Sequence, residues 1–183
     1  MDYKFARFKT RDFIILALLA AVVLLVELII SVGTGTLPVV IFALFVDPIF
    51  AILAVFIVRK FGVVILGALL AGTLALPTPA FGVVPGLAKY ILLVSAAILM
   101  ELVILIFQKR ERLASLIGGG ALVVGNSLSF YCTALFLGIP SIQDTMLVTI
   151  TIVGFFVGVV GGYIGYLIYR KIENKSFIKQ LQS

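Results

Sequence analysis

The chain has 183 residues, of which 63% are hydrophobic and 12% are charged, and its formal net charge is +6. This composition excludes a water-soluble globular protein, because a soluble domain of this length cannot bury so much apolar surface. The sequence has no His and a single Cys, Cys132, which argues against disulfide, zinc and redox chemistry, so we expect no cofactor.

Six apolar runs separated by short polar breaks predict an all-α bundle of six transmembrane helices. A helix needs about 20 apolar residues to cross the hydrocarbon core of a bilayer. In chain order the runs cover residues 13–32, 37–58, 62–76, 82–107, 113–137 and 145–169. The third run is short and requires local thinning of the bilayer or snorkelling side chains. No break is long enough for a soluble domain, so we expect a single domain over residues 1–183.

The basic residues indicate the orientation of these helices. Lys and Arg occur before the first run, in the breaks after the second and fourth runs, and after the sixth, with Lys89 as the exception. These connections alternate, so the positive-inside rule places them in the cytoplasm, together with the basic segments at residues 1–12 and 170–183. We therefore expect a multi-pass protein of a bacterial or archaeal plasma membrane with both termini cytoplasmic. This asymmetry explains the net charge, so we expect no nucleic-acid partner.

Charged residues within the first, second and fourth runs are candidate functional groups. Glu27, Asp47 and Lys89 lie there, although a charge near the centre of a membrane helix costs about 2.5 to 3.5 kcal/mol. Their depth suggests that they share a cavity between the middle and the outer half of the membrane. Two interpretations stay open: Lys89 forms a structural ion pair with Glu27 or Asp47, or these charges bind a ligand. Glu101 lies nearer the cytoplasm and is expected to meet the basic pair between the second and third runs.

The fifth run carries a polar stripe at helical spacing. Asn126, Ser129, Phe130 and Thr133 follow the spacing i, i+3, i+4 and i+7, which places them on one face of a helix. The stripe either lines a ligand cavity or makes hydrogen bonds between helices, which are worth about 0.6 to 2 kcal/mol each. We expect an outward-facing cavity beneath the loops at residues 34–36 and 77–82, lined by Glu27, Asp47, Lys89, Asn126, Ser129 and Thr133.

Small residues predict close helix packing on two of the helices. Ala17 and Ala21 form a small pair in the first run and lie roughly 80° to 120° around the helix from Glu27. They therefore offer a second face, suited to another helix or protein. In the sixth run Gly154, Gly158 and Gly162 recur every four residues and favour close packing within the bundle.

With these features the chain resembles the substrate-binding S components of energy-coupling factor (ECF) vitamin transporters. The segment Ala17-Leu18-Leu19-Ala20-Ala21 is similar to the family's AxxxA docking motif, and the basic amino terminus, six spans and basic tail match the family along the whole chain. The resemblance implies capture of a vitamin or related micronutrient and docking on a transmembrane coupling subunit with two cytoplasmic ATPase subunits. The glycine run at residues 118–120 lacks the Lys and Ser or Thr of a phosphate-binding loop, so energy must come from those partners.

Two segments of the chain resemble one particular group within this family. Residues 58–67 and 96–103 are similar to the thiamine and hydroxymethylpyrimidine group of the family, which implies thiamine or a pyrimidine precursor as the ligand. The sequence has no Trp to stack on such a ring, so Tyr90, Tyr131 or a Phe would take that role. Glu27 and Asp47 suit a cationic ligand, whereas Lys89 does not.

Two other classes remain as alternatives. A structural membrane protein of the cell-shape or division machinery can have this size, although it would not need polar residues in the outer half of the membrane. An intramembrane enzyme acting on lipids would need a general acid and base, and the sequence has neither His nor a paired acidic motif. We therefore do not expect an enzyme.

Overall fold

The computed structural model describes residues 3, 5, 7–34, 36–78, 86–136 and 144–175, with the side chains of residues 31–41 and 144–147 excluded. These residues form six helices, which confirms the predicted all-α fold. The helices are α1 (Thr10–Thr34), α2 (Thr36–Val58), α3 (Val63–Ala75), α4 (Ala88–Phe107), α5 (Glu111–Phe136) and α6 (Asp144–Ile172).

When only the residues with described side chains are considered, four of these helices are long and apolar enough to cross a membrane. Their apolar segments are Thr10–Ile30, Ala88–Phe107, Glu111–Phe136 and Val148–Ile172, and the segments Phe42–Val58 and Val63–Ala75 are shorter. The third helix is short, as expected, with 13 residues. The expected start of the fourth helix at residue 82 was wrong. Gly86 has φ +61°, a left-handed conformation that a right-handed helix cannot contain, so α4 begins after it.

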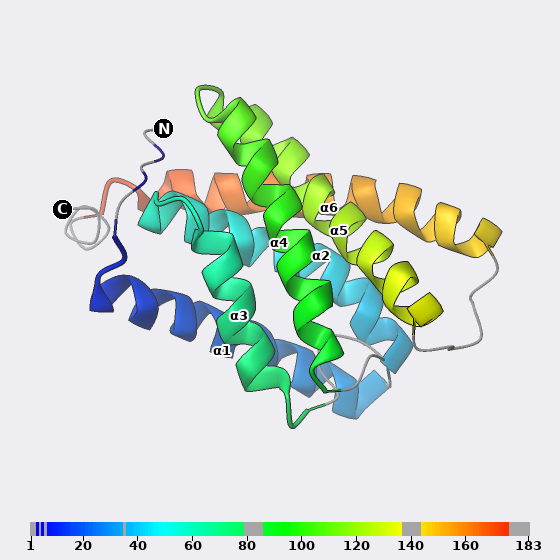
Figure 1. Ribbon diagram of the computed structural model, residues 1–183. Coiled ribbons are helices and arrows are strands. Elements are labelled where there is room, and N and C mark those ends of the chain that lie inside the picture. The colour runs from blue at the N-terminus through cyan, green and yellow to red at the C-terminus, as the bar shows by residue number, and fades with distance from the viewer. Residues whose placement is uncertain are drawn as a thin grey trace.

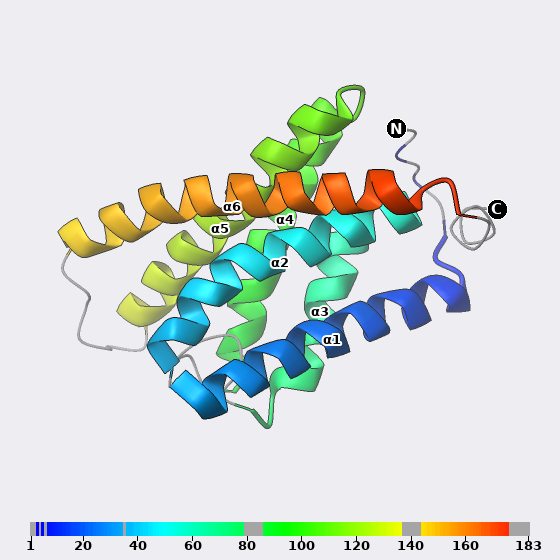
Figure 2. The ribbon, with the colours of Figure 1, turned by 180° about the vertical axis from the view of Figure 1, so that it is seen from behind.

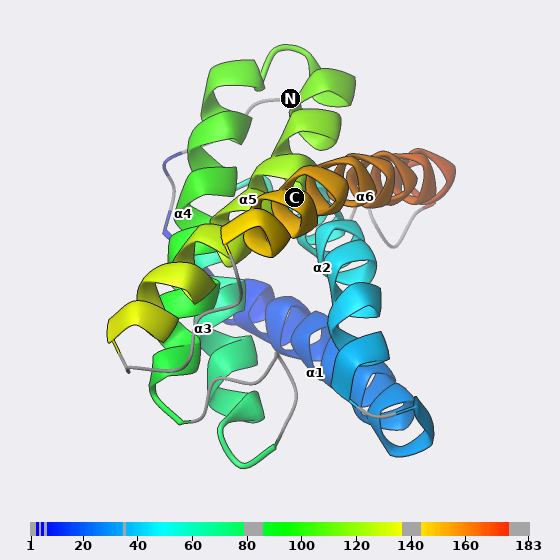
Figure 3. The same cartoon turned by 90° about the vertical axis from the view of Figure 1, so that its right-hand side faces the viewer.

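The six helices form a closed ring of neighbours. In order around the ring, α1 contacts α2, then α6, α5, α4 and α3, which contacts α1 again. The chain reverses direction at each connection (Figure 1). The view turned by 90° shows the helices arranged around the centre of the bundle (Figure 3). As a result, the start of α1, the end of α2, the start of α3 and the end of α6 lie at one end of the bundle, which we call the basic end.

Glycines allow α6 to touch both of its neighbours. A Cβ atom added to Gly162 would lie 2.2 Å from the carbonyl oxygen of Ser115, and one added to Gly158 would lie 2.5 Å from that of Gly119. Such distances are too short for real Cβ atoms, so the α5 and α6 backbones approach closely only because these positions are glycine. The expected close packing of the α6 glycines is confirmed.

The second helix continues through a proline. Pro48 lies inside α2, where it cannot donate the backbone hydrogen bond that Leu44 would otherwise accept. Figure 2 shows α2 as a curved helix that passes between α1 and α6. Phe45 lies about one turn before Pro48, and its carbonyl oxygen faces Gly161 of α6. A Cβ atom added to Gly161 would lie 2.4 Å from this oxygen. Asp47 therefore lies in the middle of α2, next to Pro48 and near a close contact with α6.

Candidate ligand-binding cavity

A cavity of about 100 Å³ lies inside the ring, and its lining residues come from α1 to α5. Most of them are aliphatic or small, with the ring of Phe50 among them. Two polar residues also line it, Asp47 from α2 and Asn126 from α5. The structure thus brings two of the predicted ligand-binding residues to one cavity from opposite parts of the sequence.

Asp47 and Asn126 each have a buried oxygen that is left without a donor. Among the described residues, no group donates a hydrogen bond to Oδ1 of Asp47 or to Oδ1 of Asn126. Most buried polar atoms in proteins are paired, and leaving one unpaired costs about 1 to 3 kcal/mol. These two acceptors therefore mark the cavity as a place where a donor from another molecule would be stabilised.

Glu27 and Lys89 lie beside this cavity. Glu27 is fully buried, and its carboxylate lies within electrostatic reach of both Asp47 and Lys89. Of the three charged residues that the sequence suggested would share one region, Glu27 is thus close enough to affect both of the others. Neither Glu27 nor Lys89 belongs to the lining of the cavity as the structure describes it.

Lys89 is bound mainly by the end of α3. Its ammonium donates a hydrogen bond to the carbonyl oxygen of Ala75, at 2.9 Å, and another to the carbonyl oxygen of Thr78. The last carbonyls of a helix have no partner within the helix and carry a partial negative charge, which suits an ammonium group. The sequence could not reveal this partner, because it is backbone and not a side chain.

The polar stripe of α5 is divided between two environments. Ser129 donates to the carbonyl of Gly125 at 2.7 Å and shares a hydrogen bond with Ser95 of α4, so its hydroxyl links two helices. Thr133 is buried, and no described residue is hydrogen-bonded to its hydroxyl, while Tyr131 is partly buried. None of these three side chains is part of the described cavity lining. Their role in ligand binding stays a prediction.

The cavity extends toward the basic end of the bundle. The outermost lining residues along each helix are Leu16 and Val23 on α1, Asp47 and Ala54 on α2, and Val63 and Ala71 on α3. Most of these residues lie in the half of each helix that is nearer the basic end. We expected a cavity beneath the external loops, of which residues 35 and 79–82 lie outside the described residues. The structure shows a central cavity that is lined on the side of the basic end by the start of α3.

Glu101 holds the start of α3 in place. Its Oε1 accepts a hydrogen bond from the amide of Val64 at 2.7 Å, and the amides of Gly62 and Ile65 lie near its carboxylate. The first amides of a helix lack partners within the helix, so a carboxylate is well placed there. The hydroxyl of Tyr3 donates to the other oxygen, Oε2. Burial, together with the charge of Glu101, raises the pKa of Tyr3, so this hydroxyl stays protonated and able to donate.

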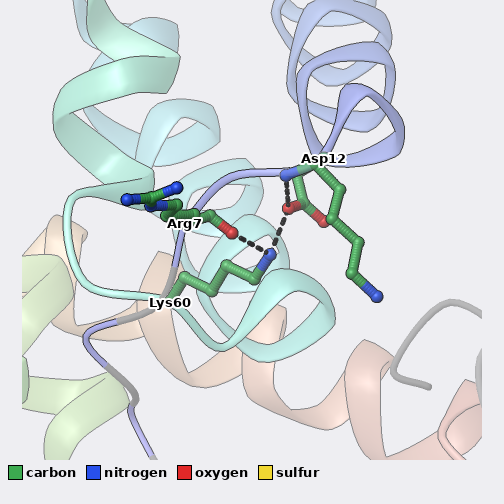
Figure 4. Close-up of polar contacts among 4 residues, drawn as sticks. Arg7, Asp12 and Lys60 are labelled. Carbon is green, nitrogen blue, oxygen red and sulfur yellow. Dashed lines mark hydrogen bonds and ion pairs between the residues drawn. The ribbon is translucent and has the colours of Figure 1, made fainter.

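The expected pairing of Glu101 with the basic pair at residues 59–60 was wrong, because both cations have other partners. Arg59 donates to the hydroxyl of Tyr169 at 2.6 Å. Lys60 bonds to the carboxylate of Asp12 at 2.5 Å and to the carbonyl of Arg7 at 2.9 Å (Figure 4). These contacts tie the segment before α1 and the end of α6 to the turn between α2 and α3, at the basic end.

The first helix presents two distinct surfaces. Ala20 and Glu27 are buried inside the bundle, and Ala20 lines the cavity. Ala17 and Ala21 are only partly buried, and they flank an exposed apolar surface that includes Leu18, which is 62% exposed. The predicted separation of the two faces is confirmed, while the docking role of the Ala17 and Ala21 face stays a prediction.

The chemistry of the cavity is that of a hydrogen-bond-accepting site in apolar surroundings. A carboxylate and an amide can hold N–H or O–H groups of a small molecule, and the ring of Phe50 can contact its face. Within the described ranges, no group of three or more His, Cys, Asp or Glu residues is arranged to hold a metal ion.

Comparisons of the chain with protein-family models, with curated protein sequences and with solved structures found no match.

Proposed function

We propose that this protein is the membrane-embedded, substrate-binding component of an ECF-type transporter, which captures a vitamin or related micronutrient. Thiamine or a pyrimidine precursor is the proposed ligand. The observation that carries the proposal is the central cavity, in which the half-buried side chains of Asp47 and Asn126 each keep a buried oxygen that no described residue donates to. A bundle that served only as a structural element would gain stability from an apolar residue in place of Asp47, because an unpaired buried acceptor is destabilising.

The arrangement of α1 supports the transport side of the proposal. In a transporter whose energy comes from partner ATPases, the component that binds the ligand needs one face for the ligand and another for the coupling subunit. The buried face of α1 contributes Ala20 to the cavity, and the partly buried Ala17 and Ala21 offer a smooth outer face. Small side chains let two helix backbones approach closely within a membrane. Docking and capture would therefore use different sides of one helix.

Replacing both Ala17 and Ala21 with Trp should abolish docking and uptake while leaving ligand capture intact. The indole rings would hold a partner helix away, whereas the residues that line the cavity are unchanged. Uptake in cells and co-purification of the coupling subunit measure docking. Mass spectrometry of the small molecule that co-purifies with the detergent-solubilised protein measures capture.

The matched control is the double variant Ile152→Trp and Phe156→Trp, which changes two exposed positions at the same spacing on α6, 55% and 63% exposed. The control should keep uptake. If the Ala17 and Ala21 variant docks like the parent, the proposed docking face is wrong. If it loses the co-purifying molecule as well, the two faces are not independent.

The proposed topology places the basic end in the cytoplasm of a bacterial or archaeal cell. In a Cys132→Ser background, which removes the exposed native cysteine, Ala80→Cys and Ser141→Cys should react with a membrane-impermeant maleimide added to intact cells. Ser176→Cys should react only after the cells are opened. All three positions lie outside the described residues, so they report on topology alone. Labelling of Ser176→Cys in intact cells would show the opposite orientation.

A further inference from the structure

We infer that the chain segment before α1 is a strap that closes the central cavity at the basic end, and that lifting the strap frees the start of α3 to open the cavity there. The strap comprises the described residues Tyr3, Phe5 and 7–9, which lie outside the helices. Its purpose rests on the proposed function, because a molecule captured from outside must leave the cavity toward the cytoplasm.

Tyr3 packs against the end of α3 that lines the cavity. Val63 and Val64 are the first residues of α3, and both line the cavity. Their side chains are buried, and Tyr3, which is 6% exposed, belongs to the same cluster of buried apolar residues. Segments outside helices normally run over the surface, so a buried aromatic residue there indicates that the strap covers apolar side chains.

The strap also contacts the turn between α2 and α3. The ring centroid of Phe61, in this turn, lies 4.7 Å from that of Phe5 and 6.4 Å from that of Tyr3. The neighbouring residue, Lys60, donates a hydrogen bond to the carbonyl oxygen of Arg7 at 2.9 Å (Figure 4). The strap therefore holds the two residues of the turn that directly precede the cap of α3.

The start of α3 depends on these contacts because its own cap is a glycine. Gly62 stands at the N-cap position with φ +87°, and it has no side chain to accept hydrogen bonds from the first amides of the helix. Glu101 accepts one from Val64 instead, and Tyr3 donates to the other oxygen of the same carboxylate. Gly67 lines the cavity, and a Cβ atom added there would meet nothing within 4 Å, so α3 has space to shift on this side.

The strap can move more easily than the helices. Phe5 is 80% exposed, and Arg7 and Lys9 are exposed as well. Lifting the strap breaks the hydrogen bonds of Tyr3 and Arg7 and the ring contacts with Phe61, whereas the helices can keep their neighbours in the ring. A segment with few buried contacts opens at a lower cost in free energy than packed helices do.

Cysteine accessibility in membrane vesicles tests the role of the strap. The reporter is Gly67→Cys in a Cys132→Ser background, and a membrane-impermeant methanethiosulfonate is added to inside-out vesicles, whose basic end faces the reagent. We expect slow labelling when the strap is intact. Tyr3→Phe should accelerate labelling about tenfold, because the lost hydrogen bond to Glu101 raises the open population by about that factor. Tyr3→Ala should accelerate it further, since the ring contact with Phe61 is lost as well.

Two controls separate opening at the basic end from general loosening of the bundle. Phe156→Ala removes an aromatic side chain of α6 that is 63% exposed, and it should label as the parent does. In right-side-out vesicles the reagent reaches the opposite end of the bundle, where the Tyr3 variants should label at the rate of the parent. Partial unfolding would instead accelerate labelling in both kinds of vesicle.

Two results would overturn the role of the strap: equal labelling of the parent and both Tyr3 variants from the basic end, or an acceleration of equal size in both kinds of vesicle. A failure of the proposed function looks different. If the Tyr3 variants behave as expected but no small molecule co-purifies with the protein, the strap stands and the capture proposal is wrong. If a nutrient co-purifies and uptake depends on Ala17 and Ala21 while the Tyr3 variants label like the parent, the transport role stands and the strap is wrong.

Discussion

Gly162→Ala should strongly destabilise the protein, whereas Gly67→Ala should be tolerated or slightly stabilising. Both substitutions add one methyl group to a glycine inside a helix, so they differ only in what the methyl group meets. At Gly162 the new Cβ would lie 2.2 Å from the carbonyl oxygen of Ser115 and 3.1 Å from Cα of Gly119. These are backbone atoms of α5, which cannot move aside by changing a rotamer. The two helices would have to separate along their whole contact.

The expected size of the effect follows from overpacking and helix propensity. Overpacking a core costs about 1 to 3 kcal/mol and more where backbone must move, so we expect Gly162→Ala to lower the free energy of unfolding by about 3 kcal/mol or more. At Gly67 nothing lies within 4 Å of the added atom. Alanine there should gain up to about 1 kcal/mol from its better helix propensity.

Thermal unfolding of the two variants in the same detergent, followed by circular dichroism, measures this difference. Gly158→Ala provides a second test of the α5 and α6 contact, because its Cβ would lie 2.5 Å from the carbonyl oxygen of Gly119. If Gly162→Ala and Gly67→Ala melted at the same temperature, α5 and α6 would not be in the close contact described above.

Glu101→Leu should be the second strongly destabilising change, because it removes the acceptor that holds the start of α3. The amide of Val64 and the hydroxyl of Tyr3 would both lose a buried partner. Each unpaired buried donor costs about 1 to 3 kcal/mol, so for two donors we expect a loss of about 2 to 6 kcal/mol. Glu101→Gln keeps an oxygen and the length of the side chain, so it should lose less than Glu101→Leu.

A double-mutant cycle with Tyr3→Phe isolates the bond between Tyr3 and Glu101. Because the two groups share a hydrogen bond, Glu101→Leu and Tyr3→Phe together should cost less than the sum of the single variants, by about 1 to 3 kcal/mol. The control is Glu173→Ala, which removes a surface ion pair with Arg170 of 2.8 Å. Such pairs are worth about 0 to 1 kcal/mol, so the control should melt nearly as the parent does. Additive effects of the Tyr3 and Glu101 changes would show that the two groups are not bonded.

The amino-acid sequence by itself determined the six helices, their approximate ends and the two faces of α1. These features depend on local patterns: the length of apolar runs, the spacing of glycines in α6 and the angle between Ala17, Ala21 and Glu27 around a single helix. Each pattern lies within one helix, so no knowledge of the neighbouring helices is needed. The start of α4 was misplaced because an apolar run does not reveal that Gly86 adopts a left-handed conformation.

Only the tertiary structure decided which polar residues meet. Asn126 and Ser129 share one face of α5, yet Asn126 lines the cavity and Ser129 bonds to Ser95 of α4. The partners of Lys89 are backbone carbonyls, and Tyr3 lies 98 residues before Glu101, outside every helix. Periodicity within a helix cannot encode such contacts, since they depend on how helices cross and on where the chain outside them folds back. For this reason the sequence could identify Asp47 as a charge within an apolar helix, but not that Asp47 lines one cavity with Asn126 and the start of α3.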